Sequence, residues 1–528
     1  MAIHRTNARH GSALRPLTGA LLSLLACAAW AQALPTPSAQ DPAANPTPLT
    51  PPGPPPVYWI EPRVFATQRY TDNFLLSTSN RQSEWTTEAG AGIMGMVNTP
   101  RLTGSVDYSL TGLYHARGIG DDSHQQALDG QMLLDAWNSV AFIEADASIG
   151  LERVSAFAVQ PAEGGSEVNT SEARRFRVSP FLRGTWGDAV DYEARVTKQV
   201  SRSNASTVSD LDEQGWNLSL GSANDVSRFG WEVAASSTKT DYSLGRSIRF
   251  DQATALGRYA VSPTLLVFAQ VGREVNDVLT SERTSYSYTS AGIDWRPMET
   301  ARVAASKSNR YFGSGHNVSL EYRMSRVLFR YLDSRDVTTS QLVSGSDVSN
   351  LGGLLNSLYQ NVEADPIRRA QLVQAELQRL GLPADLTTIP AYLTSAVALQ
   401  RTQEFSVTML TARGVLSFSL QRSRSRQLDS ALNVGGDFDL SNQIDEKGWS
   451  VAYAHRLTPR LSLNTIFQQL DTDGLSASLS SRLRSLTVGL NARLAPRTIG
   501  SVSVRRSSYQ ATSPYRELAV RAVLVHRF

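Results

Sequence analysis

The sequence predicts an all-β protein, a large antiparallel transmembrane β-barrel of about 22 strands (range roughly 18–22) with a small helical insertion. Three observations predict this fold. Apolar and polar residues alternate at period two over runs of about 10–14 residues, long enough to cross a bilayer at a tilt. Short turns alternate along the chain with longer polar links. The last strand carries an apolar stripe and ends on an aromatic residue, Phe528.

Composition limits the possible classes of protein. The 528 residues are 41% apolar with a mean hydropathy of -0.24, and no run of about 20 apolar residues occurs beyond the N-terminus. Helical membrane spans are therefore excluded. The net charge of +3 predicts no nucleic-acid partner. The single cysteine, Cys27, lies in a targeting segment, so we expect neither a disulfide nor a cysteine metal site.

The N-terminal 56 residues precede the barrel. Residues 1–31 are typical of a secretory signal peptide, with a basic start, an apolar run and the small-x-small cleavage site Ala29-Trp30-Ala31. Leu24-Leu25-Ala26-Cys27 also fits a lipoprotein box, so acylation of Cys27 stays open. Residues 32–56 are proline-rich and predict a disordered linker. The barrel itself occupies residues 57–528.

Period-two alternation is clearest in residues 102–110, 143–151, 317–324 and 486–494. One register is apolar and predicts a lipid-facing surface, and the other is polar and faces the lumen. Mixed charges in a lumen tune the selectivity of a hydrated pore, fill the lumen as salt bridges, or bind inserted helices. The charged residues that we predict to line the lumen are Asp107, Glu144, Asp146, Arg302, Glu321, Arg323, Arg493 and Arg505.

Turn spacing sets the number of strands. Ten short turns join twenty strands, and a first strand at 57–69 and a last one at 514–528 bring the total to about 22, with both termini periplasmic. Aromatic residues beside short turns predict an interfacial girdle. These residues are Trp137, Phe142, Trp186, Phe229, Trp231 and Trp295.

Residues 340–400 break the strand pattern and join strands 15 and 16 on the extracellular side. Apolar residues at helical spacing predict helices over 351–362 and 367–380, and 391–399 predicts a third short helix. Known barrels of this width are plugged, so we expect the helices to enter the lumen, with an external lid as the alternative. The residues predicted to form the plug helices are Leu351, Leu354, Leu355, Leu358, Ile367, Val373, Leu377 and Leu380.

Several segments carry a resemblance to a known family: RYTDNFLL at 69–76, the short-turn repeats, the helical 358–383 and the returning 392–420. Over roughly residues 60–528 the chain resembles the large outer-membrane β-barrel proteins associated with PEP-CTERM/exosortase and exopolysaccharide loci. Residues 412–415 (ARGV) depart from the arginine–asparagine pair expected there. The last strand resembles the closing strand of outer-membrane barrels, whose terminal aromatic residue, here Phe528, is read by the insertion machinery.

The resemblance implies an outer-membrane component of an exopolysaccharide or protein-sorting system. We expect a monomer in a Gram-negative outer membrane that passes, or helps to pass, a polymer. Its expected partners are outer-membrane lipid, the barrel insertion machinery, a polysaccharide and other secretion components. A non-conducting docking protein is the alternative, and a barrel hydrolase is a third interpretation.

A hydrolase needs a nucleophile with a base in reach. His316, in the segment GSGHN, is the nearest candidate, and a solvated loop histidine explains it more simply. Asp121-Asp122 and the pair Asp471 and Asp473 fit either calcium binding or turn chemistry. The family carries no established catalytic residues. We therefore predict no catalytic residue, no cofactor and no metal site.

Overall fold

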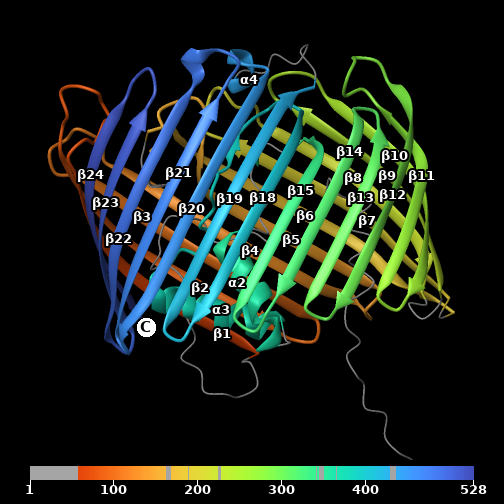
Figure 1. Ribbon diagram of the computed structural model, residues 1–528, viewed down its shortest axis with the longest axis horizontal. Helices are drawn as coiled ribbons and strands as arrows, with labels where there is room; N and C mark the ends of the chain where they lie inside the picture. The colour runs from red at the N-terminus through yellow and green to blue at the C-terminus, as the bar shows by residue number, and fades with distance from the viewer. Residues whose placement is uncertain are drawn as a thin grey trace, which may run out of the picture.

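The computed structural model describes residues 57–161, 168–187, 189–223, 228–339, 342–343, 350–363, 366–428 and 436–528. The predicted signal peptide (1–31) and linker (32–56) lie outside the described residues. Within the described residues, 22 long strands form one closed antiparallel barrel (Figure 1). The predicted fold class is therefore confirmed.

The wall strands follow each other in chain order. The first fifteen are β1 (Tyr58–Thr71), β2 (Glu84–Asn98), β3 (Leu102–His115), β4 (Ser123–Trp137), β5 (Ala141–Arg153), β6 (Thr170–Trp186), β7 (Val190–Ser203), β8 (Leu211–Ser222), β9 (Phe229–Tyr242), β10 (Ile248–Ser262), β11 (Leu265–Asn276), β12 (Thr284–Met298), β13 (Ala301–Arg310), β14 (Gly313–Arg323) and β15 (Val327–Thr338). The last seven are β18 (Ala398–Thr411), β19 (Gly414–Gln427), β20 (Gln443–Thr458), β21 (Leu461–Asp473), β22 (Ser481–Ala495), β23 (Thr498–Gln510) and β24 (Tyr515–Arg527).

The first and last strands close the barrel. β1 pairs with β24 from Arg63 opposite Arg527 to Thr71 opposite Ala519, and the Phe528 amide donates to the Pro62 carbonyl at 3.1 Å. Closure gives each edge strand a partner. A membrane offers no water to the backbone groups of an open edge, so a closed barrel is the β-structure that can span it.

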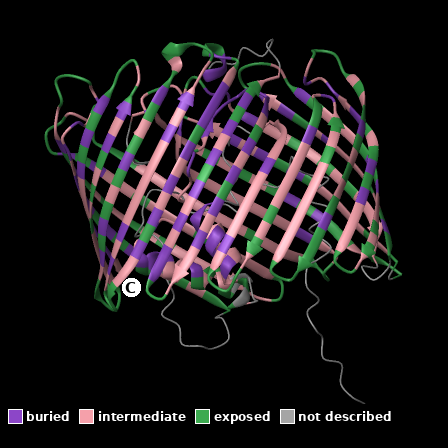
Figure 2. Ribbon diagram, in the orientation of Figure 1, coloured by how far each residue is buried: buried purple, intermediate pink, exposed green. Residues whose placement is uncertain are grey.

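The two faces of the wall differ as the alternation predicts. On β22, Leu486, Val488 and Leu490 are exposed on the outside, whereas Ser485 and Asn491 are buried toward the lumen. Figure 2 shows the same alternation along most strands. On β24 the outer stripe is Leu518, Val520, Ala522 and Leu524, and it ends with the exposed Phe528. The outer surface is therefore that of a transmembrane barrel of the outer-membrane type.

The two ends of the barrel differ in loop length. At one end, the short-turn end, hairpins are tight: Asn138 and Ser139 have φ of 50° and 56°, and the Val140 amide donates to the Trp137 carbonyl at 2.9 Å. Two central residues with positive φ are the mark of a type I′ hairpin turn. Both barrel termini lie at this end, and the longer links lie at the opposite, long-loop end (Figure 1).

The predicted aromatic girdle is confirmed for five of its six residues. Trp137, Trp186, Phe229, Trp231 and Trp295 are exposed on the outer face near the short turns. The prediction for Phe142 is wrong. Its side chain points into the lumen, stacks on Phe181 and lies under the guanidinium of Arg183. Its even number places it in the lumen-facing register of β5, together with Glu144 and Asp146.

The insertion between β15 and β18 contains two helices and a small hairpin. Its elements are β16 (Leu342–Val343), α2 (Leu351–Leu358), η2 (Tyr359–Asn361), α3 (Pro366–Leu380) and β17 (Tyr392–Leu393). Two predicted helices are thus confirmed, and the third, over 391–399, is wrong. Tyr392 and Leu393 instead pair with β16, and Ala398 already belongs to β18.

Two further short helices lie in links between wall strands, α4 (Asp437–Leu440) and η3 (Ala477–Leu479). None of the helices in the described residues is long and apolar enough to cross a membrane.

A charge placed on either face tests the assignment of faces. Val233 is exposed on the outer face of β9, and its neighbour Ala234 lies in the lumen-facing register beside Ser219 and Thr254. Val233→Arg is expected to lower the free energy of unfolding by about 2–4 kcal/mol, because the charge meets lipid near the bilayer midplane. Ala234→Arg is expected to lower the free energy of unfolding much less, because the charge enters the lumen. Guanidinium titrations of protein in vesicles, followed by tryptophan fluorescence, measure both, and equal costs would contradict the assignment.

Candidate functional site

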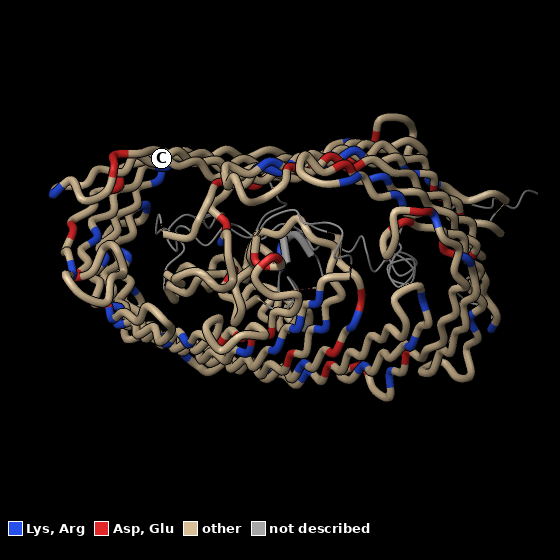
Figure 3. The backbone as a smooth tube through the Cα atoms, turned by 90° about the horizontal axis from the view of Figure 1, so that it is seen from above, with Lys and Arg blue, Asp and Glu red and all other residues tan. Residues whose placement is uncertain are grey.

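The insertion lies inside the barrel and forms the candidate site. It starts and ends at the long-loop end, where Thr338 and Ala398 are direct partners across β15 and β18. Seen from above, its described segments lie within the oval wall (Figure 3). Its helices reach the opposite, short-turn end, where Arg323 Nη1 donates to the Ser357 carbonyl at 3.3 Å. The insertion therefore extends along the height of the lumen.

An apolar patch on the lumen wall holds the helices. The inward residues Val415, Ala452 and Ala454 of β19 and β20 are buried against the insertion. Leu328 of β15 is buried in the same way against α2. The insertion supplies leucines and one valine to these contacts: Leu351, Leu354, Leu355, Leu358, Val373, Leu377, Leu380 and Leu382. Apolar residues in a hydrated lumen would be unfavourable, and the helices remove them from water.

All of these side chains except Leu382 are among the eight predicted plug residues. The remaining predicted residue, Ile367, lies in α3, and its side chain is outside the described set.

The C-terminus of α3 is fixed by its own chain and by the wall. Gly381 has φ of 69°, and the Leu382 amide donates to the Leu377 carbonyl at 3.0 Å, which is the Schellman pattern. A helix end leaves backbone carbonyls without partners. Here Asn491 Nδ2 donates to the Gln378 carbonyl at 2.6 Å, and Ser462 Oγ donates to the Arg379 carbonyl at 2.8 Å. Wall side chains thus complete the helix.

A side chain at position 381 would not fit. A Cβ there would come within 2.6 Å of Asn464 Nδ2 and 2.9 Å of the Asn491 Cβ. Glycine is needed both for the left-handed backbone and for the close approach of α3 to the wall.

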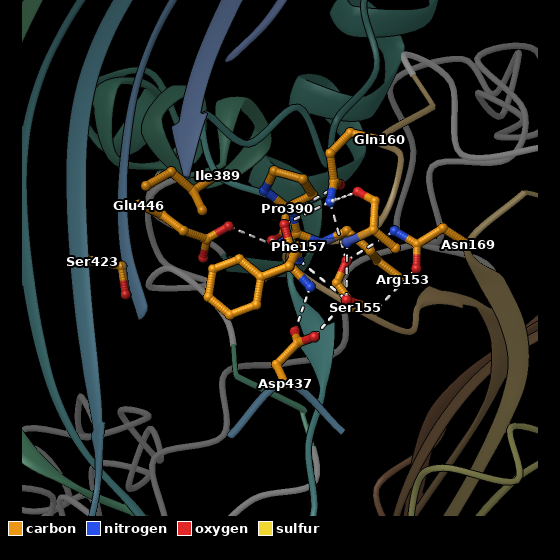
Figure 4. Close-up of polar contacts among 12 residues, drawn as sticks. Arg153, Ser155, Phe157, Gln160, Asn169, Ile389, Pro390, Ser423, Asp437 and Glu446 are labelled. Atoms are coloured by element: carbon orange, nitrogen blue, oxygen red, sulfur yellow. Dashed lines mark hydrogen bonds and ion pairs between the residues drawn. The ribbon is translucent and has the colours of Figure 1, made fainter. Parts of the chain in front are cut away.

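A buried cation anchors the returning half of the insertion near the long-loop end (Figure 4). Arg153 Nη2 donates to the Pro390 carbonyl at 2.8 Å and to Glu446 Oε1 at 2.9 Å, and its Nη1 donates to Gln160 Oε1 at 3.0 Å. Its guanidinium also lies 5.4 Å from the centre of the Tyr392 ring. We call these contacts the Arg153 anchor. They connect the insertion to β20 and to the link after β5.

A second buried carboxylate, from the link between β19 and β20, binds the link after β5. Asp437 of α4 accepts hydrogen bonds from Ser155 Oγ and from the Ala156 amide (Figure 4). Burial raises the pKa of Asp437, and these hydrogen bonds and the charge of Arg153 oppose the shift. Ala156 and Phe438 join an apolar cluster with Tyr392. The insertion is therefore held by apolar contacts at both ends of the lumen.

Further polar bonds attach the returning segment to the wall. Gln468 Nε2 donates to the Thr387 carbonyl at 3.0 Å, and the Ile389 amide donates to Gln421 Oε1 at 3.2 Å. On the opposite wall, Gln371 Nε2 of α3 lies 3.5 Å from Met96 Sδ of β2. The insertion therefore contacts both long sides of the barrel.

Most predicted lumen charges form ion pairs within the wall. Arg63 donates to Asp107 through both terminal nitrogens, at 2.6 and 3.1 Å. Arg195 lies 2.6 Å from Glu144, and Arg177 lies 2.7 Å from Asp146.

The pattern of pairing continues around the barrel. Arg302 lies 2.7 Å from Asp294, and Arg505 lies 3.3 Å from Glu517. Together these pairs make a wall of mixed sign whose net charge is largely cancelled locally.

The remaining three predicted residues have different surroundings. Glu321 lies between Arg302 and Arg330 in the register of the sheet. Arg323 binds the insertion through Ser357 and Gln360. Arg493 is exposed at the short-turn rim, where it donates to the Pro496 carbonyl at 3.2 Å.

Sequence reasoning missed two groups of lumen residues: the arginines that pair with the predicted acidic residues, and the residues that hold the insertion. Arg177 and Arg195 share the lumen-facing register with their acidic partners, so strict alternation would have found them. Glu446 also follows the inward register of β20. Arg153 ends β5 and breaks its alternation, so no periodic signal marks it.

The structure corrects the environment of His316. This residue lies on β14 and not on a loop, and its Nε2 is 3.0 Å from Asp333 Oδ1. Both side chains belong to the outer register, away from the lumen. Across the described part of the chain, His, Cys, Asp and Glu side chains form no group of three or more with the arrangement of a metal site.

Comparisons with known proteins give distant structural matches and no family. No protein-family model and no curated protein matches it. Among solved structures, the siderophore receptor PirA from Pseudomonas aeruginosa matches with 11% identity and a TM-score of 0.43, over 88% of this chain and 80% of PirA. An apoprotein form of the FrpB iron transporter from Neisseria meningitidis matches with 9% identity and a TM-score of 0.48, over 89% and 81%.

Loss of the Arg153 anchor is expected to loosen the insertion. Arg153→Met leaves Glu446 as a buried carboxylate without its cation, a change that typically costs about 3–5 kcal/mol. Trypsin should then cut the insertion at Arg368, Arg369 or Arg379 at least ten times faster than in the unaltered protein. Peptide mass spectrometry after timed digestion measures the rate.

Two variants make that result specific. Arg153→Met combined with Glu446→Met removes both charges, so cleavage should return toward the original rate. Arg174→Met removes an exposed arginine that pairs with Glu172 on the outer face, and it should leave the rate unchanged. Unchanged cleavage in Arg153→Met would show that this contact does not hold the insertion.

The stability of the folded insertion in the lumen is expected to depend on pH through Asp385. Burial in the lumen raises the pKa of Asp385 to about 7, and the negative charge of Glu152 adds to the rise. The folded insertion therefore favours the protonated carboxyl group. This stabilisation is complete below the unfolded-state pKa of about 4 and is lost as the pH rises through about 7.

Amide hydrogen exchange of α3, corrected for intrinsic rates, should be slower at pH 5 than at pH 8. Asp385→Asn should remove most of the difference. A difference that persists in Asp385→Asn would assign the pH dependence to another group.

Proposed function

We propose that this protein is an outer-membrane component of an exopolysaccharide or PEP-CTERM sorting system, and that it passes, or helps to pass, a polysaccharide across the outer membrane. The observation that carries the proposal is a helical insertion that lies in the lumen of a 22-strand barrel and continues into the wall strands at the long-loop end, on both sides. The resemblance of residues 60–528 to barrels of exopolysaccharide loci supports the choice of cargo.

The attachment of the insertion suits a gate. Thr338 and Ala398 are paired on adjacent strands, so the segment between them can leave the lumen without breaking a wall hydrogen bond. Most of its contacts use side chains; in the described residues, backbone contacts are the short bridge between Tyr392 and Arg153 and the bond from the Leu428 amide to the Val397 carbonyl at 3.0 Å. Barrier and wall are therefore separate parts of the fold.

The lumen wall suits a hydrated polymer. Its charges are balanced in pairs such as Arg63 with Asp107 and Arg177 with Asp146, so the wall carries no strong field of one sign. A neutral or weakly charged glycan would meet hydrogen-bond donors and acceptors along its path. A wall of one sign would instead bind a charged polymer tightly and slow its release.

A second candidate function is a structural or docking role without conduction. The observation that favours it is that α3 touches both long sides of the barrel, through Gln371 to Met96 and through Arg379 to Ser462. An insertion bound to both sides of the wall would stay in the lumen and stabilise the barrel.

Replacing the insertion separates the two functions. In the variant, residues 340–397 are exchanged for a short Gly/Ser turn, which the paired Thr338 and Ala398 can accommodate. We expect large, steady single-channel conductance in planar bilayers for the variant and little for the unaltered protein, because the variant lacks the segment that lies in the lumen.

Release of sugars from vesicles measures whether the passage admits the proposed cargo. Vesicles that contain the variant should release trapped neutral oligosaccharides, and vesicles with the unaltered protein should retain them. A folded, inserted variant that does not conduct would overturn the proposed passage and favour the docking role. Conductance in both proteins would show an open path beside the insertion.

A further inference from the structure

The outer face of the barrel carries a belt of cations close to the long-loop end. On β22, Arg482 and Arg484 share the register of the exposed Leu486, Val488 and Leu490, so they lie on the outer face above the apolar band. The same change from apolar to basic residues occurs on other strands toward the same end. The belt includes Arg174, Lys198, Arg202, Lys239, Arg249, Arg401, Arg422, Arg424, Lys447, Arg482 and Arg484.

The short-turn end has a different outer ring. Its outward positions hold Trp186, Phe229, Trp231, Trp295 and Leu494, which suit the boundary between lipid tails and headgroups. The cations therefore belong to one leaflet of the membrane. In the orientation given by the turns, this is the outer leaflet.

The densest part of the belt lies on three adjacent strands, β18 to β20. Arg401 binds Asp333 through Nε at 3.1 Å and Nη2 at 2.8 Å. Arg422 binds Asp445 through Nε at 3.2 Å and Nη2 at 2.9 Å, and Arg424 Nη2 lies 2.7 Å from the same carboxylate. Three guanidinium groups thus share two carboxylates, and positive charge remains.

The register places two of these cations directly opposite each other. Arg401 is the cross-strand partner of Arg424, and Gln403 is the partner of Arg422. Like charges directly opposite one another on a sheet are destabilising. The three arginine side chains are nevertheless 41–47% exposed on a surface that faces lipid. An anion shared between Arg401 and Arg424 would remove the repulsion.

The guanidinium groups have donors for such an anion. Within the described part of the chain, Arg401 and Arg422 each use Nε and Nη2 on a carboxylate, which leaves the two Nη1 hydrogens for another acceptor. Arginine binds phosphate oxygens through pairs of parallel N–H groups. The position of the cluster, directly above the apolar band, matches the level of lipid headgroups.

We propose that Arg401, Arg422 and Arg424 form a binding site for the phosphate groups of the phosphorylated glycolipid (lipid A) in the outer leaflet. Asp333 and Asp445 hold the arginines in place and keep them extended along the wall. The choice of leaflet rests on the outer-membrane location in the proposed function, but the site does not depend on passage of a polymer. The glycolipid would surround the barrel and fix its height in the membrane.

A charge-neutral variant tests this site. Arg401→Gln, Arg422→Gln and Arg424→Gln are combined with Asp333→Asn and Asp445→Asn, so that no carboxylate is left alone. The variant removes three cations and two anions, so the cluster loses one net positive charge. Each net cation near a lipid surface contributes roughly a fivefold gain in affinity, so binding of lipid A should weaken at least fivefold. Binding is measured by titrating purified lipid A into the full-length protein in neutral detergent, with bound phosphate counted by native mass spectrometry.

A matched control neutralises a pair inside the lumen, Arg505→Gln with Glu517→Gln, and should leave lipid A binding unchanged. Phosphatidylglycerol in the same titration should bind the unaltered protein more weakly than lipid A. If both lipids bind equally, the site recognises any anionic headgroup and the glycolipid assignment is overturned. Equal lipid A affinity in the charge-neutral variant and the unaltered protein would overturn the site itself.

A salt titration tests the same site without a variant. Lipid A affinity of the unaltered protein should fall steeply between about 50 and 500 mM NaCl, since exposed charges are screened over that range. Affinity that does not change with salt would overturn the site. The charge-neutral variant should keep the conductance of the unaltered protein, so failure of the proposed passage and failure of this site give different results.

Discussion

Closure of the backbone hydrogen-bond ladder is the constraint on which the rest of the structure depends. Inside a membrane, each amide or carbonyl group without a hydrogen-bond partner raises the free energy of the folded protein by several kcal/mol, because no water is present to replace the partner. The pairing of β1 with β24 gives the edge strands partners and makes the chain one continuous cylinder. Strand length, even strand number and the separation of short turns from long loops all follow from a closed sheet that crosses a bilayer.

Closure also explains how much of the fold was predictable from sequence. Each strand has one side toward lipid and one toward the lumen, so the period-two pattern, for example at Leu486 to Leu494, is imposed on every strand. Turn counting then gave the correct number of strands. The lumen register of Asp107, Glu144 and Arg505 follows from the same alternation, because a residue's face is set by its parity.

The placement of the insertion was not determined by local pattern. Helical spacing predicted α2 and α3, but whether leucines such as Leu354 cover a lumen wall depends on residues far away in sequence, Leu328 and Leu410 among them. Residues 391–399 were predicted as a helix because their apolar spacing is ambiguous, and pairing with β16 decided otherwise. Phe142 was assigned to the girdle by its nearness to a turn, although its parity places it inside.

Barrel and insertion have different sources of stability. The wall is held by backbone bonds that lipid cannot replace, whereas the insertion is held by side chains such as Arg153, Asn491 and Leu377 that water can replace in part. The insertion can therefore open at a much lower free energy than the barrel unfolds. Because its ends are adjacent wall residues, such opening leaves the cylinder intact. A rigid wall with a less stable internal segment is the arrangement that a gated passage requires.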